Sequence, residues 1–211
     1  METTHQYLDK YPIPKESEKL IVGTIHPHDH DKFEMQFFYG NKNSIWNVLS
    51  EAFPKDLKQP ITFKEVENFL KSKKIALSDT IRKCVRESPT ALDKDLIPIK
   101  LNTEIIEQII NSNINEILFT SGFAKNNAFK LFYIDILGNK KIPSEVRKNR
   151  EIILEKEFGR PVKLTVLYSP SGSANVGLSK SKLYKERFNK YEGSIKPISL
   201  FKIDYYKEKF S

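Results

Sequence analysis

The chain of 211 residues contains a single cysteine, Cys84. One thiol excludes an internal disulfide, a cysteine-rich zinc site and a cysteine-ligated iron–sulfur cluster. The sequence has no run of about 18 apolar residues, so it predicts no transmembrane helix. Its first residues, METTHQYLDKYPIPKES, are polar and partly acidic, unlike a secretory signal. We therefore expect a cytoplasmic protein with no membrane partner.

Internal repeats, low-complexity tracts and linkers are also missing from the sequence. Glycine and proline are scattered rather than clustered. The length suits one domain with a continuous hydrophobic core. We expect a single domain over residues 1–211.

Excess positive charge is confined to the last third of the sequence. The net charge is +8, and residues 140–211 hold 17 Lys or Arg against 8 Asp or Glu, so the other residues sum to −1. A localised excess suggests a surface that faces a polyanion such as a nucleic acid. Lys-rich helices that are merely solvated are also common, so charge alone leaves both interpretations open.

Hydrophobic patterning indicates that strands and helices alternate along the chain. Short apolar, β-branched runs predict strands, and apolar residues three or four positions apart predict helices. The expected strands are 18–25, 73–79, 96–99, 115–122, 162–172 and a short β-like stretch at 198–205. The expected helices are 44–53, one opening at a Thr62–Glu65 capping box, 103–111, 123–136, 144–157 and 179–190.

This alternation predicts an α/β fold, with three α/β/α layers and a central, largely parallel sheet of four to five strands. In such sheets ligands bind at the carboxyl ends of the strands. Three expected strands end in loops of small or polar residues, with the sequences GTIHPHD, TSGFAKNN and YSPSGSAN. We expect these three loops to form one pocket.

Three of the four histidines, His26, His28 and His30, lie in the first of these loops together with Asp29 and Asp31. This pattern resembles the HxH cluster of metal hydrolases. Such enzymes complete the metal shell with histidines from later loops, because one short segment cannot surround an ion. The remaining histidine here is His5, which precedes the cluster. We therefore expect a polar loop and no metal site.

A stretch of aromatic and amide residues, FYGNKNSIW at 38–46, resembles a segment of the uracil-DNA glycosylase superfamily. The likeness is closest to the branch of mismatch-specific and hypoxanthine (deoxyinosine) DNA glycosylases. In that branch the first strand ends in a Gly-Ser/Thr-x-Pro-like loop, followed by an aromatic residue and an asparagine motif that ends in tryptophan. The matching residues here are Gly23, Thr24, Pro27, Phe38, Asn43 and Trp46.

The resemblance continues in order along the chain. IALSDTIRKCVRESPTALDKDL at 75–96, INEILFTSGFAKNNAFKLF at 114–132 and LYSPSGSAN at 167–175 are each similar to later segments of the same branch. No single motif is very specific, but the occurrence of four such motifs in the order of the family is specific. The likeness covers about 20–178 and leaves a basic extension at 179–211. It implies the family's fold and a DNA glycosylase activity.

The resemblance also implies roles for individual residues. Asn43 would position the water that attacks the sugar, although an asparagine before a helix is also a common N-cap. The first loop has one extra residue before its proline, with Ile25 or His26 where other branches have an acid or an amide. That departure makes Asp29 the second catalytic candidate.

The departing base would be stacked and read by a second group of residues. Phe38 would stack on the base with Tyr39 nearby, the alternative being that Phe37 and Phe38 are core residues. The base-binding candidates are therefore Phe38, Tyr39, Ser121 and Gly122, with Asn126 and Asn127 as weaker ones.

The last loop and the helix behind it would bind DNA. Small hydroxyl residues let the backbone approach a phosphate, and lysines add affinity without sequence choice. A plain Ser/Gly loop is the alternative, and Ser169 stands where the best-known branch has a catalytic histidine. The DNA-binding candidates are Ser169, Ser171, Ser173, Asn175, Lys180 and Lys182.

We interpret the sequence as that of a monofunctional DNA glycosylase, expected as a monomer without metal or cofactor. It would hydrolyse the bond to a deaminated or mismatched base, uracil or hypoxanthine, in single- or double-stranded DNA. Two alternatives stay open: a nucleic-acid-binding protein that has lost the chemistry, and a metal-dependent hydrolase that uses the three loop histidines. A Schiff-base lyase would need a buried, activated lysine; Lys125 is one candidate, but nothing in the sequence marks it as buried.

Overall fold

The computed structural model describes residues 1–41, 45–88 and 92–211 of the chain. These residues divide into two compact units. Unit 1 consists of Met1–Phe33 and Lys74–Leu167, and unit 2 of Glu34–Lys73 and Tyr168–Ser211. The expectation of a single domain stays a prediction.

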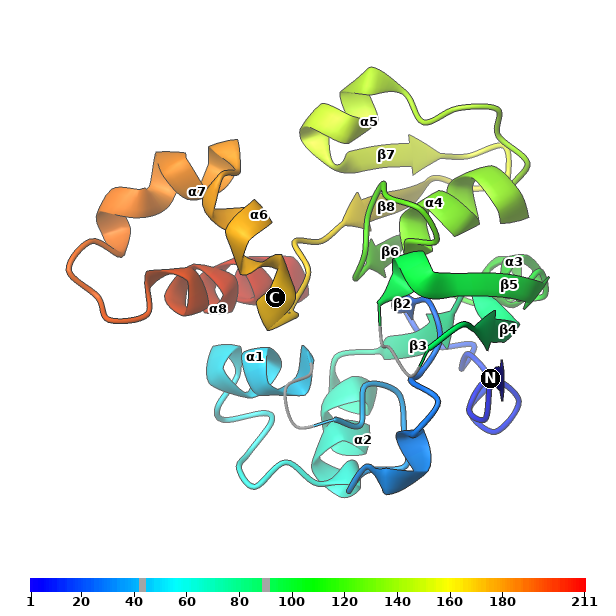
Figure 1. Ribbon diagram of the computed structural model, residues 1–211, viewed down its shortest axis with the longest axis horizontal. Helices are drawn as coiled ribbons and strands as arrows, with labels where there is room; N and C mark the ends of the chain where they lie inside the picture. Colours follow the sequence, from blue (N-terminus) through cyan, green and yellow to red (C-terminus); the bar gives the residue numbers. More distant parts are fainter. Residues whose placement is uncertain (42–44, 89–91) are drawn as a thin grey trace. The chain divides into compact units, whose positions relative to one another are not determined.

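Unit 1 is built on a five-stranded, mostly parallel sheet. The strands are β2 (Lys19–Gly23), β3 (Ile75–Asp79), β6 (Glu116–Phe119), β7 (Glu151–Leu154) and β8 (Val162–Val166), in the order β3-β2-β6-β8-β7 (Figure 1). β7 alone is antiparallel to its neighbour. The predicted α/β class with a largely parallel five-stranded sheet is therefore confirmed, whereas the three-layer arrangement stays a prediction.

A second, antiparallel sheet of unit 1 was not expected from the sequence. It joins β1 (Glu2–Thr4), β4 (Ile81–Arg86) and β5 (Leu96–Leu101), in the order β1-β4-β5. The stretch 96–99 was correctly predicted to be extended. The strand β4 was missed because its buried residues Ile81, Cys84 and Arg86 do not alternate regularly, and the ladder shifts register beside Lys83.

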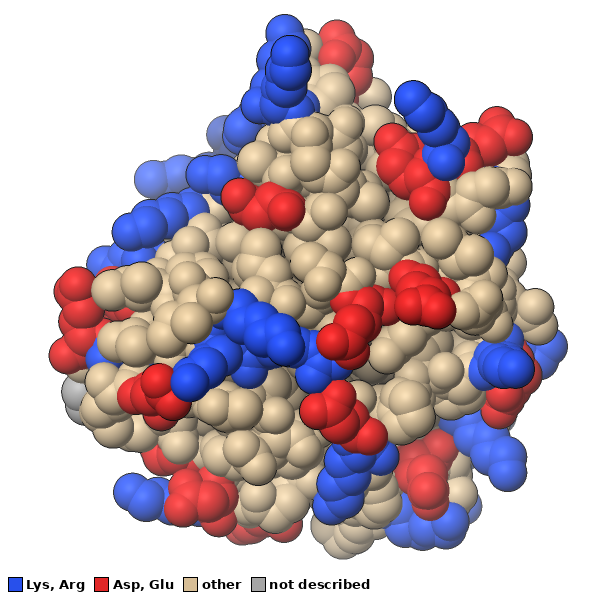
Figure 2. Space-filling model, turned by 90° about the vertical axis from the view of Figure 1, so that its right-hand side faces the viewer, with Lys and Arg blue, Asp and Glu red and all other residues tan. Residues whose placement is uncertain are grey.

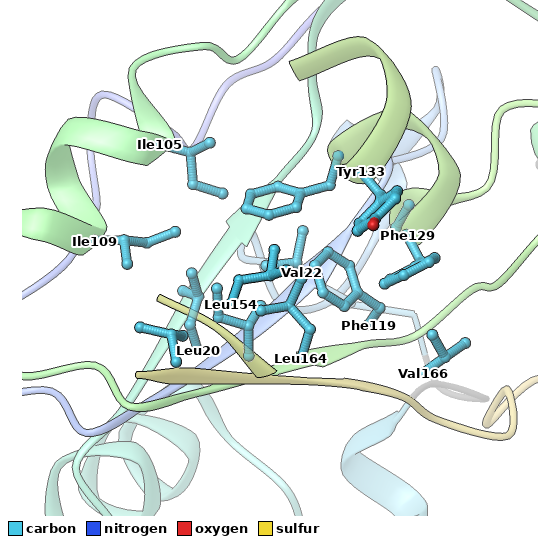
Figure 3. Packing of buried hydrophobic residues seen from close by; sticks show 14 of the residues in the cluster. Leu20, Val22, Ile105, Ile109, Phe119, Phe129, Tyr133, Leu154, Leu164 and Val166 are labelled. Carbon is cyan, nitrogen blue, oxygen red and sulfur yellow. The ribbon is translucent and has the colours of Figure 1, made fainter. Parts of the chain in front are cut away.

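The hydrophobic core of unit 1 lies on one face of the parallel sheet. Leu20 and Val22 of β2 point to the same face because strand side chains alternate. They pack against α3 (Ile105–Ile110) and against α4 (Ala128–Lys130), which continues as a π-helical turn, η3 (Leu131–Ile136). Figure 3 shows Ile105 and Ile109 of α3 facing these strand residues, with Phe129 and Tyr133 beside them.

The predicted helices of unit 1 are shorter than expected. The helix expected over 123–136 begins only at Ala128. The helix expected over 144–157 is α5 (Ser144–Asn149), and the residues after it form β7. Arg150 takes a left-handed conformation, φ 62°, which ends the helix, and the β-branched Ile152 and Ile153 then pair with β8.

Unit 2 is helical and contains a cluster of aromatic rings. It comprises α1 (Ile45–Ala52), α2 (Phe63–Ser72), α6 (Asn175–Ser179), α7 (Lys182–Arg187) and α8 (Pro197–Phe210), with short turns η4 (Gly172–Ala174) and η5 (Phe188–Lys190). The Thr62 hydroxyl accepts a hydrogen bond from the Glu65 amide at 3.3 Å, which confirms the Thr62 half of the predicted capping box, whereas the Glu65 carboxylate accepts from the Lys58 amide. In Figure 1 the chain runs from α6 through α7 to α8, in orange and red.

The β-like stretch predicted at 198–205 is wrong, since these residues belong to α8. The reason is visible in ring pairs four residues apart, a spacing that brings side chains together on a helix. Phe201 stacks on Tyr205 with ring centroids 5.9 Å apart, and Tyr206 stacks on Phe210 at 5.8 Å. None of the described helices is long and apolar enough to cross a bilayer.

Candidate functional site at the carboxyl ends of the parallel strands

Asp93 of unit 1 joins the loops that follow β2 and β6. Its carboxylate accepts a hydrogen bond from the Thr24 hydroxyl at 2.8 Å and another from the Asn127 side-chain amide at 2.8 Å. Ser121 also hydrogen-bonds to this carboxylate. Burial raises the pKa of Asp93 above its ordinary value, while the three hydrogen bonds oppose that rise. One half-buried carboxylate thus holds two strand ends together.

The backbone of the same segment is fixed by Asn126. Its side-chain amide donates to the Asp93 carbonyl at 3.0 Å and to the Leu96 carbonyl. Asn126 is buried and takes a left-handed conformation, φ 58°, which asparagine tolerates better than most residues. We refer to Thr24, Asp93, Ser121, Asn126 and Asn127 as the Asp93 network.

Two predicted base-binding residues, Ser121 of this network and its neighbour Gly122, follow β6. The Ser121 hydroxyl accepts a hydrogen bond from the Ala128 amide at 2.8 Å, so it also caps the start of α4. Gly122 lies close to the next strand, because a Cβ at this position would stand 3.2 Å from Val166. Both residues are half-exposed, which leaves this strand end open to a ligand.

Arg86 links the Asp93 network to the first loop. Its guanidinium is buried and donates to the His26 carbonyl at 2.9 Å. Burial lowers the pKa of Arg86, and this effect is opposed by Cys84 and by the carboxylates of Asp93 and Asp29, which raise it. Asp29 is half-buried and makes no side-chain cap at the turn η1 (His30–Lys32). The structure therefore places the catalytic candidate Asp29 within the same electrostatic cluster as Asp93.

His26 of the first loop uses both of its ring nitrogens in hydrogen bonds within the protein. His26 accepts from the Gln6 amide at Nε2, at 3.1 Å, and donates to the Pro27 carbonyl from Nδ1, at 2.8 Å. Burial is the main cause that lowers the pKa of His26 to about 4, so the ring is neutral near pH 7. In the described part of the chain, no three His, Cys, Asp or Glu side chains are placed to hold a metal ion. The donor geometry thus gives no support to a metal hydrolase at this loop.

A buried His5–Asp79 pair was missed by sequence reasoning. His5 Nε2 lies 2.8 Å from the Asp79 carboxylate at the end of β3. Its Nδ1 accepts from the Tyr7 and Leu8 amides, at 3.1 and 3.3 Å, so the Nε2–H donates to Asp79. The pair fastens the N-terminal segment to the sheet. Asp79 ends a predicted strand, which was the available signal, but nothing in the sequence pointed to a partner 74 residues away.

The predicted stacking residues belong to unit 2, and one catalytic candidate cannot be placed. Phe38 is 1% exposed, and its carbonyl accepts from the Trp46 indole at 3.0 Å. The alternative that Phe37 and Phe38 are core residues describes this structure, and stacking of Phe38 on a base stays a prediction. Tyr39 is half-exposed with φ 53°. Asn43 lies outside the described residues.

The predicted DNA-binding loop also lies in unit 2, where a buried lysine supports it. Ser171 accepts from the Ser173 amide, and their hydroxyls are 2.8 Å apart. Lys202 of α8 donates from Nζ to the Pro170 carbonyl at 3.1 Å and the Ser171 carbonyl at 2.8 Å. Burial lowers the pKa of Lys202 to about 8. Sequence reasoning missed Lys202 because it lies in the stretch misread as a strand.

The other DNA-binding candidates in unit 2 are less tightly held. Ser169 accepts from the Ser171 amide at 3.3 Å, and Asn175 begins α6. Lys180 is exposed at the end of α6. Lys182 is exposed and pairs with Glu186 at 3.5 Å, one helical turn away. Such an exposed pair is worth little energy, so Lys182 could exchange this partner for a phosphate.

Comparisons with known proteins give one similar solved structure. No protein-family model matches the sequence, and no curated protein sequence does. The similar structure is described as "Solution NMR Structure of a putative Uracil DNA glycosylase from Methanosarcina acetivorans". The alignment covers 99% of each chain, with 19% sequence identity and a TM-score of 0.46. At that identity and score, the likeness assigns neither a fold nor a function to this chain.

Proposed function

We propose that this protein is a DNA glycosylase that hydrolyses the N-glycosidic bond of a deaminated or mismatched base. The observation that supports it most is the Asp93 network. Thr24, Asp93 and Ser121 come from three separate segments that resemble the uracil-DNA glycosylase superfamily, and their side chains meet at one carboxylate. They meet where open α/β sheets bind ligands. Residues from three separate segments of the resemblance therefore lie together at one site in unit 1.

The chemistry needs three things from the protein. The base must leave the DNA stack, at a cost of about a few kcal/mol, and enter a pocket. Hydrogen-bond donors must stabilise the negative charge that develops on it. The backbone amide of the half-exposed Gly122 is the donor we propose for the base edge, and the Ser121 hydroxyl, whose one O–H donates to Asp93, holds this strand end in position. Uracil and hypoxanthine both present a carbonyl oxygen that such donors can bind.

Water must then attack the sugar as the base departs. We propose Asn43 to hold this water through its amide, with Asp29 as the residue that orients it or accepts its proton. Neither role requires a metal or a cofactor. The serine loop around Ser171, supported by Lys202, would hold a phosphate of the same DNA strand. In this proposal the protein acts as a monomer on lesion-containing DNA.

The activity is tested by alkaline-cleavage gels on duplexes with one uracil or one hypoxanthine. We expect strand breaks that require alkali, since a hydrolytic glycosylase leaves an intact abasic site. Asn43→Ala should lower the single-turnover rate by about 10² or more, the effect of losing a positioned hydrogen bond in the transition state. Asp29→Asn should lower it as well, with Asp31→Asn, two residues along the loop, as the matched control.

Each other outcome of this assay contradicts part of the proposal. Breaks without alkali would indicate a lyase. No breaks with either base, together with retained DNA binding, would favour the nucleic-acid-binding alternative that has lost the chemistry. Full activity of both Asn43→Ala and Asp29→Asn would show that the protein is a glycosylase whose catalytic residues are others.

A further inference from the structure

Arginine partners in this structure single out one guanidinium. All six arginines lie in the described part of the chain, and five of them donate to carbonyl or carboxylate oxygens. Those five are Arg82, Arg86, Arg150, Arg160 and Arg187. Arg147 of α5 instead lies over the ring of Phe123, 5.4 Å from its centroid. No described carboxylate lies within ion-pair distance of Arg147, which is exposed.

Phe123 is held in place from several sides. Its ring packs edge-on against Phe129, with centroids 5.6 Å apart. The Arg150 guanidinium also lies over the ring, 5.5 Å from the centroid. Arg150 is itself fixed, because it donates to the Val166 carbonyl at 2.8 Å and the Leu167 carbonyl at 2.7 Å, where β8 ends. These contacts hold the ring in place. The ring is also half-exposed, so it remains accessible to a ligand.

The position of this ring matters for the proposed function. Phe123 follows Gly122 directly, and Ser121 of the Asp93 network is two residues away. The Arg147–Phe123 surface, defined as Phe123, Lys125, Arg147 and Arg150, therefore borders the candidate site at the ends of β6 and β8. All of it belongs to unit 1.

Charge around this ring is locally unbalanced. Lys125 and Arg147 are exposed and make no ion pair with a described residue. On the face drawn in Figure 2, Lys and Arg side chains lie among Asp and Glu side chains. Cations near an aromatic ring and without acidic partners suit an anion that also carries flat rings. A phosphodiester strand with unstacked bases has both features.

We propose that the Arg147–Phe123 surface binds the DNA strand next to the excised base, with Arg147 on a phosphate and Phe123 against an unstacked neighbouring base. This inference rests on the proposed function for its DNA partner. Arg147 lies over this ring in the free protein, so its planar guanidinium, whose paired N–H groups match a phosphate, leaves the ring for the phosphate as the base takes its place. Arg150 holds the ring from the protein side.

The test measures binding of a fluorescein-labelled single-stranded oligonucleotide by anisotropy over a series of NaCl concentrations. Arg147→Gln should weaken binding about tenfold, the size expected for one charge-assisted contact. It should also reduce the slope of log affinity against log salt by about 0.7, the value for one phosphate on a single strand. The matched control is Lys148→Gln, an exposed neighbour on α5 that contacts no ring; it should change affinity less than about twofold.

A second variant separates the ring from the charge. Phe123→Leu should weaken binding of a normal oligonucleotide more than binding of one with abasic sites, because only bases can stack. Equal losses on both would overturn the role of Phe123. Identical behaviour of Arg147→Gln and Lys148→Gln would overturn the phosphate contact. An equal loss of affinity for polyglutamate would overturn it too, since the surface would then be a general anion site.

The outcomes distinguish this inference from the proposed function. If the wild type excises a base and Arg147→Gln binds DNA normally, the inference fails while the function stands. If the wild type excises nothing, yet Arg147→Gln loses both affinity and salt slope, the function fails while the DNA-binding surface stands.

Discussion

The two units of this protein use polar groups in different ways. In unit 1, buried polar side chains form specific pairs at the ends of strands, such as His5 with Asp79 and Thr24 with Asp93. In unit 2, the interior is a cluster of aromatic rings around α8, and its main buried charge, Lys202, binds loop carbonyls. Unit 1 holds 20 Lys or Arg against 18 Asp or Glu, whereas unit 2 holds 15 against 9.

This difference suggests a division of labour. Burying polar groups costs stability unless each one is satisfied, so a chain keeps such networks where position matters. Unit 1 therefore fits the part that recognises the base in the proposed function. Aromatic packing with a basic surface needs no such accuracy and fits a part that attracts a polyanion. Variants in each unit can break or sharpen this contrast.

The largest expected effect comes from the aromatic cluster of unit 2. Phe201 is fully buried and contacts the rings of Tyr184 and Tyr205. Phe201→Ala should lower the free energy of unfolding by about 3–5 kcal/mol, as for other large-to-small changes in a core. Urea denaturation measures this, with Leu200→Ala, a 42% exposed neighbour, as the control. A loss below about 1 kcal/mol would contradict the assignment of Phe201 to a packed core.

How far the sequence could predict this structure differs between the units as well. The parallel strands were predictable because each is a short, mostly apolar segment that is buried on both faces. The helix α8 was not predicted, because apolar and polar residues alternate in ISLFKIDYY as they do in a strand. The helical spacing is evident only in the rings, which pair four residues apart in the structure. The early end of the helix that begins at Ser144 results from the left-handed backbone of Arg150. An arginine gives no indication of that conformation in the sequence.

The candidate site was predictable in place but not in detail. Strand ends and small-residue loops located Ser121 and Gly122 correctly at the end of β6. The role of Asp93 was not predictable, because its partner Thr24 lies 69 residues away and one sequence carries no record of contacts. The same holds for Arg147, which appears in the sequence as one of many surface cations.

A smaller loss is expected at the Asp93 network. Asp93→Asn replaces one of the two acceptor oxygens with a donor, so Thr24, Ser121 and Asn127 can no longer all donate to this side chain. We expect unfolding free energy to fall by about 1–3 kcal/mol, the cost of an unsatisfied buried group. The control is Asp95→Asn, two residues along the same turn. Equal stability of both variants in urea would show that the network does not hold the strand ends together.

The pH dependence of stability should report His26. Because the folded pKa of His26 is about 4, against about 6.5 when unfolded, the unfolded chain binds more protons between these values. Stability should therefore fall as pH drops from about 6.5 to about 4, by on the order of 1–2 kcal/mol from this residue after solvent screening. His26→Gln should flatten this part of the urea-measured curve. His28→Gln, on the same loop, should not; if it does, the burial of His26 is not the cause.

The smallest effect on stability is expected at Lys202 in unit 2. Lys202→Met removes two hydrogen bonds but also a buried charge, so the unfolding free energy should change by less than about 1 kcal/mol. Amide exchange at Ser171 to Ser173 should nevertheless speed up, because the loop loses its support from α8. Hydrogen–deuterium exchange read by mass spectrometry measures this, with Lys207→Met as the exposed control on the same helix. Unchanged amide exchange in Lys202→Met would contradict the claim that Lys202 supports the loop.

The most direct test of the central claim maps where a target base contacts unit 1. An oligonucleotide with one 2′-fluoro-2′-deoxyuridine resists hydrolysis, because the fluorine disfavours the sugar cation, and so remains bound. Titrated into ¹⁵N-labelled protein, it should shift the amide resonances of Thr24, Ser121, Gly122 and Asn127 more than an oligonucleotide with thymidine does. Uracil-dependent shifts that avoid these strand ends would contradict the assignment of the site to the Asp93 network.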